Sequence, residues 1–500
     1  MNSMQNSSSQ ELTLEQIQNF KGTYPKQIWS LFFIEMWERF CFYGNRGMLT
    51  VFMVDVLLMS GRESNLRYGA IQAFVYAFTF IGGLFADKIL GFQKSLFWGA
   101  LLMISGSAIL GISAKEFFYP GMCLIIVGTG FFKPNISTMV GELYKKGDTR
   151  RDTGFSLFYS GINVGALFGG AVCVYVGKSY SWDIAFLLSG IFIFIGLITF
   201  LITKKNLGPI GLQPAAIKID KHGKKKEWAV YVGTILVLPF IYLMITNTEY
   251  TDIFMYIIGP LTLIYLFYEM RTFSLNENKK LFAALVFIFF SIVFWAFFEQ
   301  SGGSLNLFAK DNLHTNLGFF HIDPNVVNNS ANSVFVVLFS PLLGLLWLKL
   351  AKKKVEPNAV IKFGIGFLFL ALSFYTLYYT KFFMDSTGKT SLAIFTLAYF
   401  IMTFGELCLS PIGLSLMTKL SPQRLWGVMM GLWFLASAYG QYFAGILGAG
   451  MSTPNDKAPL SEKLIAYTTG YQQLAIYALI AGVLLIIISP LVKKLMQEVK

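Results

Sequence analysis

The chain has 500 residues, of which 55% are hydrophobic and only 13% are charged, a composition too apolar for a soluble globular protein. Apolar runs of about 20 residues, the length that crosses a lipid bilayer, recur from residue 27 to residue 492, so the sequence predicts an all-α polytopic membrane protein. The net charge of +13 comes mainly from basic residues in short loops between these runs, which argues against nucleic-acid binding.

Fourteen transmembrane helices are predicted along the chain. Their expected limits are 28–58, 67–87, 95–113, 118–143, 153–177, 182–203, 228–246, 252–270, 281–309, 329–350, 359–380, 391–418, 425–449 and 466–492. If the N-terminus lies inside, the inner loops and tails carry a roughly threefold excess of Lys and Arg, so both termini are expected to be cytoplasmic. Residues 1–26 are polar and lack the apolar core of a signal peptide, and we interpret them as a cytoplasmic tail.

A basic linker, "KKNLGPIGLQPAAIKIDKHGKKK", follows the sixth predicted helix. The next two helices carry few groups that could perform chemistry, and six more helices follow them. We therefore predict a six-helix bundle over 27–204, a linker with a helical hairpin over 205–280, and a second six-helix bundle over 281–500. Transporters built from two such bundles bind their substrate between them, near the middle of the membrane.

The first predicted helix is unusual because it carries four charged residues, Glu35, Glu38, Arg39 and Arg46. At about 100° per residue they share one helix face. Charged groups inside a membrane cost roughly 2.5 kcal/mol or more each and usually mark an ion or substrate path. The alternative is a salt-bridge cluster that only fixes helix packing. Since Arg39 lies within one turn of both glutamates, we expect its guanidinium to satisfy one carboxylate well but not both.

Three further charged residues, Lys133, Glu299 and Glu406, fall inside other predicted helices. Together with the first helix they give four acids and three bases, so one acid has no basic partner. A carboxyl group without a partner in an apolar cavity favours its protonated form, which is the property that a proton carrier needs. All three histidines lie in predicted loops, so any proton coupling is expected to use carboxylates.

Motifs for other chemistry are missing from the sequence. It has no HExxH, Walker A or CxxC pattern, and its four cysteines all fall in predicted helices. We therefore expect no enzyme activity, no metal site and no cofactor, with a proton gradient as the driving force. A membrane receptor or polytopic enzyme would need a large soluble domain or a nucleophile constellation that the sequence lacks.

Five motifs resemble those of one transporter family. The first-helix motif "EMWERFCFYGNRGML" resembles the signature of the proton-dependent oligopeptide transporters, a branch of the major facilitator superfamily. The other four are "GGLFADKILG", "FSLFYSGINVGAL", "FFEQSGGSLNLFA" and "GELCLSPIGLS", in the order of the family. The resemblance implies a major facilitator fold with an inserted two-helix hairpin, as in bacterial members. It also implies proton-coupled uptake of di- and tripeptides by alternating access across the bacterial inner membrane.

The resemblance also implies roles for individual residues. Those matching proton-coupling positions are Glu35, Glu38, Arg39 and Lys133, and those matching an inter-bundle gate are Arg46 and Glu299. Arg39 and Lys133 match residues that hold the peptide carboxylate, and Glu406 matches the acid that faces the amino group. The other positions that match the substrate pocket are Tyr43, Tyr76, Tyr159, Asn163, Asn332, Ser410 and Trp433. A cavity with a basic side and an acidic side would recognise both ends of a zwitterionic peptide while its side chains vary.

Alternatives remain for single residues and for the substrate. Ordinary aromatic packing would equally explain Tyr76 and Tyr159, and it is the simpler reading of Trp433 without the family. Phe42 stands where the family usually has a tyrosine, and Thr79 and Ser333 replace common prolines. The alternative function is a proton-coupled carrier of another small solute, such as nitrate or a peptide-like metabolite. Relatives with such substrates commonly lose the first-helix glutamates, which this chain keeps.

Overall fold

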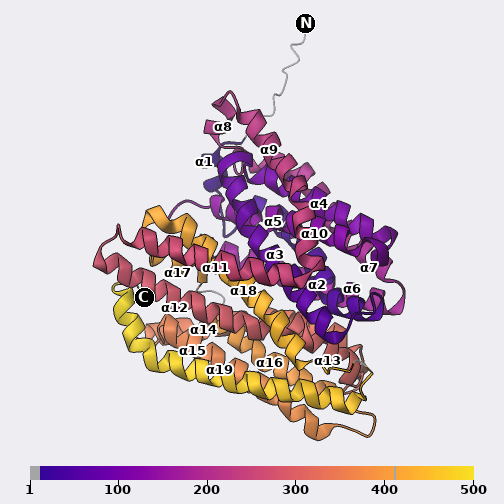
Figure 1. Ribbon diagram of the computed structural model, residues 1–500. Helices are drawn as coiled ribbons and strands as arrows, with labels where there is room; N and C mark the ends of the chain where they lie inside the picture. Colours follow the sequence, from indigo (N-terminus) through magenta and orange to yellow (C-terminus); the bar gives the residue numbers. More distant parts are fainter. Residues whose placement is uncertain (1–11, 410–412, 456, 500) are drawn as a thin grey trace.

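The computed structural model describes residues 12–409, 413–455 and 457–499, and in this range every long element is a helix. Figure 1 shows the helices of the N-terminal half, in indigo to magenta, gathered in the upper part of the molecule. The orange and yellow helices of the C-terminal half lie below them. The prediction of an all-α protein is confirmed, and each half buries its own apolar core.

The N-terminal bundle contains six long helices among the described residues. They are α2 (Gln27–Asp55), α3 (Gly61–Phe85, extended by η1, Ala86–Leu90), α4 (Phe92–Ile112), α5 (Ala114–Glu142), α6 (Arg150–Ser179) and α7 (Trp182–Thr203). Serine side chains cap two of them, because Ser60 accepts a hydrogen bond from the Glu63 amide and Ser181 from the Ile184 amide. We name the two ends of the molecule after the limits of α2, the Gln27 end and the Asp55 end.

The C-terminal bundle begins at α12. Its elements are α12 (Leu275–Phe298), η3 (Glu299–Gly302), α13 (Ser304–Asn312), β1 (Asn316–Leu317), β2 (Phe320–His321), α14 (Pro324–Lys352), α15 (Ala359–Tyr379), η4 (Thr380–Phe383), α16 (Leu392–Leu409), α17 (Gly413–Lys419), η5 (Gln423–Leu425), α18 (Trp426–Met451) and α19 (Leu460–Met496). The two short strands pair antiparallel. The bundle starts before the predicted boundary at 281, because Ser274 and Glu277 form a capping box at the start of α12.

The predicted span over 281–309 falls within one apolar helical segment, Leu275–Asn312, but the structure breaks the helix between α12 and α13. The chain makes one 3₁₀ turn over Glu299–Gly302 and then a non-helical residue, Gly303. A Cβ atom on Gly302 would lie 1.9 Å from the Tyr68 hydroxyl, so only glycine allows α3 to approach this turn. The break leaves Glu299 at the end of α12, where it faces the N-terminal bundle.

The two bundles meet along α3 and α18. A Cβ atom on Gly69 would lie 2.8 Å from the Cα atom of Gly445, so the two backbones touch there. At the Asp55 end, ion pairs also join the bundles: Lys310 lies 2.5 Å from Asp55, and Lys178 lies 2.6 Å from Asp323. The structure is therefore closed between the bundles at the Asp55 end.

The segment between the bundles contacts both of them. It contains η2 (Lys204–Leu207), α8 (Ala215–Ile219), α9 (Gly223–Leu236), α10 (Leu238–Thr246) and α11 (Thr248–Met270). The Lys94 ammonium of α4 lies 2.6 Å from Glu227 of α9, so the first arm follows the N-terminal bundle. The Tyr442 hydroxyl of α18 donates a 2.6 Å hydrogen bond to Asp252 of α11, so the second arm also contacts the C-terminal bundle. In Figure 1, α11 lies beside α18.

Part of the predicted N-terminal tail is ordered against the N-terminal bundle. A short helix, α1 (Leu14–Gln18), buries Ile17 in the core at the Gln27 end. The Gln18 amide donates a 2.9 Å hydrogen bond to the Glu142 carbonyl at the end of α5. Arg150, at the start of α6, lies over the Phe20 ring at 3.9 Å. Hydrogen bonds from Arg150 also hold the pKa of Asp148 below its usual range. We call residues 12–24 the N-terminal strap.

Twelve helical segments in the described part of the chain are long and apolar enough to cross a membrane. They include two segments between the bundles, Gly223–Thr246 and Thr248–Met270, and the long helices of both bundles, except α2 and α18. The predicted helix over 391–418 corresponds to α16 and α17, and residues 410–412 between them lie outside the described residues.

Candidate functional site

Arg39 lies between the two glutamates of α2. Its Nε atom is 2.9 Å from Glu35 Oε1 and 2.6 Å from Glu38 Oε2, and all three side chains are buried. The helix spacing brings both carboxylates within ion-pair distance of Arg39, and the structure agrees with the expectation that Arg39 does not satisfy both of them well. Arg39 Nε and Nη2 have no hydrogen-bond partner of good geometry among the described residues, and neither does either oxygen of Glu38.

Lys133 of α5 faces aromatic rings instead of a carboxylate. Its Nζ atom lies 4.2 Å from the centre of the Tyr76 ring and 5.1 Å from that of Phe42. The Arg39 guanidinium lies 5.5 Å from the same Phe42 ring, so two cations share one aromatic side chain. Among the described residues, no carboxylate lies within ion-pair distance of Lys133. The basic side of the predicted cavity is thus formed by Arg39 and Lys133 around Phe42.

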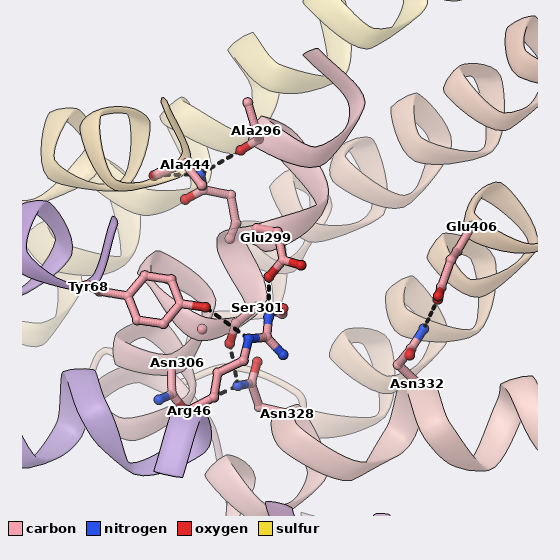
Figure 2. A network of polar contacts seen from close by, with 12 residues as sticks. Arg46, Tyr68, Ala296, Glu299, Ser301, Asn306, Asn328, Asn332, Glu406 and Ala444 are labelled. Atoms are coloured by element: carbon pink, nitrogen blue, oxygen red, sulfur yellow. Dashed lines mark hydrogen bonds and ion pairs between the residues drawn. The ribbon is translucent and has the colours of Figure 1, made fainter. Parts of the chain in front are cut away.

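Arg46 connects the two bundles through Glu299 and Ser301, and it also binds Tyr68 of its own bundle (Figure 2). Its guanidinium forms an ion pair with Glu299 of η3. It also donates hydrogen bonds to the Ser301 hydroxyl at 2.6 Å and to the Tyr68 hydroxyl at 2.9 Å. Both charged side chains are largely buried, so the pair is desolvated on both sides. The structure brings together the two residues that the sequence proposed as a gate.

Glu406 of α16 lies apart from this cluster (Figure 2). The side-chain amide of Asn332, on α14, donates a 2.9 Å hydrogen bond to Glu406 Oε2 and a 3.2 Å hydrogen bond to the Thr403 hydroxyl. No cation lies within ion-pair distance of Glu406 in the described part of the chain. Glu406 is therefore the acid that remained without a basic partner in the charge count from the sequence.

A cavity of about 100 Å³ lies between the bundles, and neither Arg39 nor Lys133 belongs to its wall. The sequence-predicted residues in its wall are Tyr43, Arg46, Tyr76, Glu299, Asn332 and Glu406. The wall also contains Phe42, Trp295, Phe298, Ser301, Asn328, Asn329, Ser333 and Tyr399. Phe42 and Tyr76, which contact Lys133, lie on one side, so the basic groups adjoin the cavity that Glu406 lines. The cavity thus combines an acid, buried amides and aromatic rings next to two cations.

The structure does not bring every predicted pocket residue to this cavity. The Asn163 amide donates a 3.0 Å hydrogen bond to the Tyr159 carbonyl on the same helix, and neither residue belongs to the cavity wall. Trp433 is buried in the core of the C-terminal bundle. Ser410 lies outside the described residues.

Sequence reasoning missed several residues of this region. Tyr68 and Ser301 bind Arg46, Thr403 contacts Asn332, and Asn328 accepts a 2.6 Å hydrogen bond from the Tyr399 hydroxyl. One signal for part of this set was present. The run "NNSANS" places one asparagine just before, and two within, the otherwise apolar predicted helix over 329–350, where buried amides require partners. Which partners they find depends on other helices, which the sequence alone does not place.

Comparisons with known proteins identify the family. The PTR2 profile of the POT family matches residues 93–464. The chain is 32% identical to the peptide transporter YePEPT of Yersinia enterocolitica over 95% of this chain and 96% of that protein. It is 30% identical to dipeptide and tripeptide permease B of Aliivibrio fischeri over 95% of this chain and 96% of that protein.

Solved structures agree with the sequence comparison. A mutant of the peptide transporter POT in complex with alafosfalin has a TM-score of 0.83 and 31% identity, and the match covers 97% of this chain and 100% of that one. A POT family transporter in complex with 5-aminolevulinic acid has a TM-score of 0.81 and 28% identity, with 96% and 100% covered. The chain is thus a membrane transporter rather than an enzyme, and it belongs to the POT family.

Proposed function

We propose that this chain takes up di- and tripeptides together with protons by alternating access. The observation that carries the proposal is the cavity between the bundles, with Glu406 in its wall and the cations Arg39 and Lys133 beside it. A zwitterionic peptide carries one charge of each sign on its backbone, so such a cavity can bind both ends while the side chains differ. The names of relatives, such as dipeptide and tripeptide permease B, support the same substrate class.

The peptide carboxylate would bind on the basic side. Arg39 Nη2 is a buried donor without a hydrogen-bond partner among the described residues, and a buried unsatisfied donor often marks a binding group. Arginine binds carboxylates through two parallel hydrogen bonds, and Lys133 adds a point charge nearby. The peptide amino group would bind Glu406, which Asn332 positions through its amide. We assign pocket roles to Tyr43 and Tyr76 from the family and from their place in the cavity wall, and to Tyr159, Asn163, Ser410 and Trp433 from the family alone.

Proton coupling would use the triplet Glu35, Glu38 and Arg39. Two buried carboxylates share one guanidinium in the structure. If one glutamate binds a proton, Arg39 loses an ionic partner and becomes available to a peptide carboxylate. Proton and peptide would then favour the same state, which gives the reciprocal coupling that a symporter needs. A proton gradient drives this cycle, so the proposal requires no cofactor.

We further propose fourteen transmembrane helices, arranged as six, a hairpin of two, and six. This adds α2 and α18 to the twelve apolar segments. Both are long enough to cross a bilayer, with 29 and 26 residues. Glu35, Glu38 and Arg39 of α2 face the protein interior, where they are buried, and Arg46 is largely buried at the interface. From the loop charges, we place the Gln27 end and both termini in the cytoplasm, in the inner membrane of a bacterium.

The substrate class can be tested by competition. Vesicles containing the full chain would take up a labelled dipeptide, and unlabelled compounds would be added in excess. We expect other dipeptides and tripeptides to compete, nitrate not to compete, and an N-acetylated dipeptide to compete about tenfold or more weakly. The reason is that acetylation removes the amino group's charge and its charge-assisted hydrogen bond to Glu406.

The variant Glu406→Gln tests the assigned partner of the amino group. It should lower dipeptide uptake strongly while the folded protein is retained, because glutamine has nearly the same shape. In this variant, free and N-acetylated dipeptides should differ less in how strongly they compete with uptake of the labelled dipeptide. Competition by nitrate, or equal competition by free and acetylated peptides in the unmodified protein, would contradict the proposed function.

A further inference from the structure

One buried asparagine outside the predicted site connects the two bundles. Asn306 of α13 is fully buried, and its side-chain Nδ2 donates two hydrogen bonds across the interface. The acceptors are the Gly47 carbonyl at 2.9 Å and the Thr50 hydroxyl at 2.9 Å. Both acceptors belong to α2 of the N-terminal bundle. The donor side of this amide therefore faces the opposite bundle.

The acceptor side of Asn306 faces its own bundle. Three side-chain amides of α14 donate to Asn306 Oδ1, from Asn325 at 2.9 Å, Asn328 at 3.1 Å and Asn329 at 3.1 Å. An amide with its oxygen and nitrogen exchanged would set a donor against these three donors. The orientation of Asn306 is therefore fixed by its own bundle, and its Nδ2 is held ready for α2.

This contact adjoins the candidate substrate cavity. Asn328 and Asn329 lie in the cavity wall, and Asn328 donates a 2.8 Å hydrogen bond to the Ser301 carbonyl. The Ser301 hydroxyl in turn accepts from Arg46 (Figure 2). The interface is also closely packed, because a Cβ atom on Gly47 would lie 2.9 Å from Asn329 Cγ. The cluster thus combines tight packing with hydrogen bonds between the bundles.

We propose that Asn306 is a neutral latch that holds the Asp55 end closed. The inference rests on the proposed function, because alternating access requires the bundles to part at this end. Parting would separate Asn306 Nδ2 from Gly47 and Thr50, whereas the amides within α13 and α14 would stay together. Two hydrogen bonds are therefore made in the closed state alone, and contacts made in one state alone shift the equilibrium between states. Asn306 acts as a positioning residue for the transport cycle, not as a substrate ligand.

The chain offers a matched control on the same helix. Asn312 is also fully buried, and its Nδ2 donates to the Gly388 carbonyl at 2.9 Å and to the Leu460 carbonyl at 2.7 Å. Both of those acceptors belong to the C-terminal bundle. Asn306→Ala and Asn312→Ala each remove a buried amide with two donor contacts. Only the first removes contacts between the bundles.

A reporter cysteine can measure opening without transport. Ser330 of α14 is 8% exposed and donates a 3.4 Å hydrogen bond to the Leu167 carbonyl of α6, across the same interface. In a Ser330→Cys background, the purified full chain in detergent would be reacted with a water-soluble maleimide, which reaches both ends of the molecule. The four native cysteines are all buried, so their background reaction should be low.

We expect Asn306→Ala to raise the labelling rate of the reporter about tenfold, the effect of losing two hydrogen bonds of ordinary net strength. Asn312→Ala should leave the rate within about twofold of the parent. Thr50→Val removes an acceptor of Asn306 and also the 3.0 Å hydrogen bond from the Thr50 hydroxyl to the Gly302 carbonyl, so it should raise the rate in the same direction as Asn306→Ala. If Asn306→Ala does not fold, an unchanged rate in Thr50→Val contradicts the latch. An unchanged rate in both interface variants, or an equal rise in Asn312→Ala, would overturn the latch. Since labelling needs no peptide, a failure of peptide uptake would refute the proposed function separately.

Discussion

At the level of single residues, Arg46 and Glu299 give the clearest test of gating. Both are largely buried at the interface, so removing one charge leaves the other without its ionic partner. Breaking a buried pair in this way typically costs about 3–5 kcal/mol. We expect Arg46→Glu and Glu299→Arg each to reduce peptide uptake strongly in vesicles. The double swap should restore uptake only partly, because Arg46 also binds the Ser301 and Tyr68 hydroxyls.

A swap of the half-exposed pair Lys178 and Asp323 serves as the control. This pair also joins the bundles at the Asp55 end, but exposed ion pairs contribute about 1 kcal/mol or less. Its single variants should therefore lower uptake much less than those of Arg46 and Glu299. If the double swap of Arg46 and Glu299 is no better than either single variant, a direct gating pair is contradicted.

Residue positions on one helix were predictable from the sequence, whereas contacts between helices were not. Spacing along α2 placed Glu35, Glu38 and Arg39 on one face, and the structure brings them together. The same reasoning predicted that Arg39 would not satisfy both carboxylates well, and neither oxygen of Glu38 has a hydrogen-bond partner in the described part of the chain. The aromatic surroundings of Lys133 and the amide partner of Glu406 come from other helices, so helix periodicity carries no information about them.

At the level of elements, the N-terminal strap should stiffen the connection between α5 and α6. Arg150 donates hydrogen bonds to the Phe20 carbonyl at 3.2 Å and to the Gly22 carbonyl at 3.0 Å. We expect Arg150→Gln to release the strap and raise the rate of trypsin cleavage after Lys21, measured on the purified protein by mass spectrometry. Local opening of this kind requires only a few contacts to break.

Arg151 provides the control for this experiment. It is the next residue of α6, but its guanidinium lies over the Phe155 ring at 5.2 Å instead of the strap. Like Arg150→Gln, the variant Arg151→Gln removes one positive charge and one arginine after which trypsin can cut. Its cleavage rate after Lys21 should therefore match that of the parent chain. Equal cleavage in the Arg150→Gln and Arg151→Gln variants would show that Arg150 does not hold the strap.

The sequence predicted most helices well because long apolar runs and polar connections mark their limits. It missed the break between α12 and α13, since the Gly302 and Gly303 pair alone does not reveal that α3 packs against it. It also missed α1, which is short and buries a single apolar residue, Ile17. Both features arise from tertiary contacts, which override local preferences.

At the level of the whole molecule, the segment between the bundles, which was predicted as a linker and hairpin, contacts both of them. Glu227 of α9 pairs with Lys94 of the N-terminal bundle, and Glu269 of α11 pairs with Arg424 of the C-terminal bundle. Movement of one bundle relative to the other must therefore change the hairpin or its contacts. The sequence predicted a basic linker and a helical hairpin here from charge and hydropathy, and the family resemblance implied that the hairpin is an insertion. Its attachment to both bundles was visible only in the structure.

The central claim is that protons drive peptide uptake through Glu35, Glu38 and Arg39. The most direct measurement compares two activities of reconstituted vesicles, for the parent chain and for Glu38→Gln. One is accumulation of a labelled dipeptide driven by an imposed pH gradient, and the other is exchange of labelled for unlabelled dipeptide without a gradient. Glu116→Gln, at an exposed position at the start of α5, serves as the control variant.

We expect the parent chain and Glu116→Gln to accumulate the dipeptide above its outside concentration only with the pH gradient. Glu38→Gln should lose this accumulation but keep exchange, because exchange moves no net proton while the peptide ends still bind Arg39 and Glu406. Arg39→Lys should lose both activities, since lysine offers a point charge in place of a planar fork. Accumulation against the peptide gradient with normal pH dependence in both Glu35→Gln and Glu38→Gln would contradict the account.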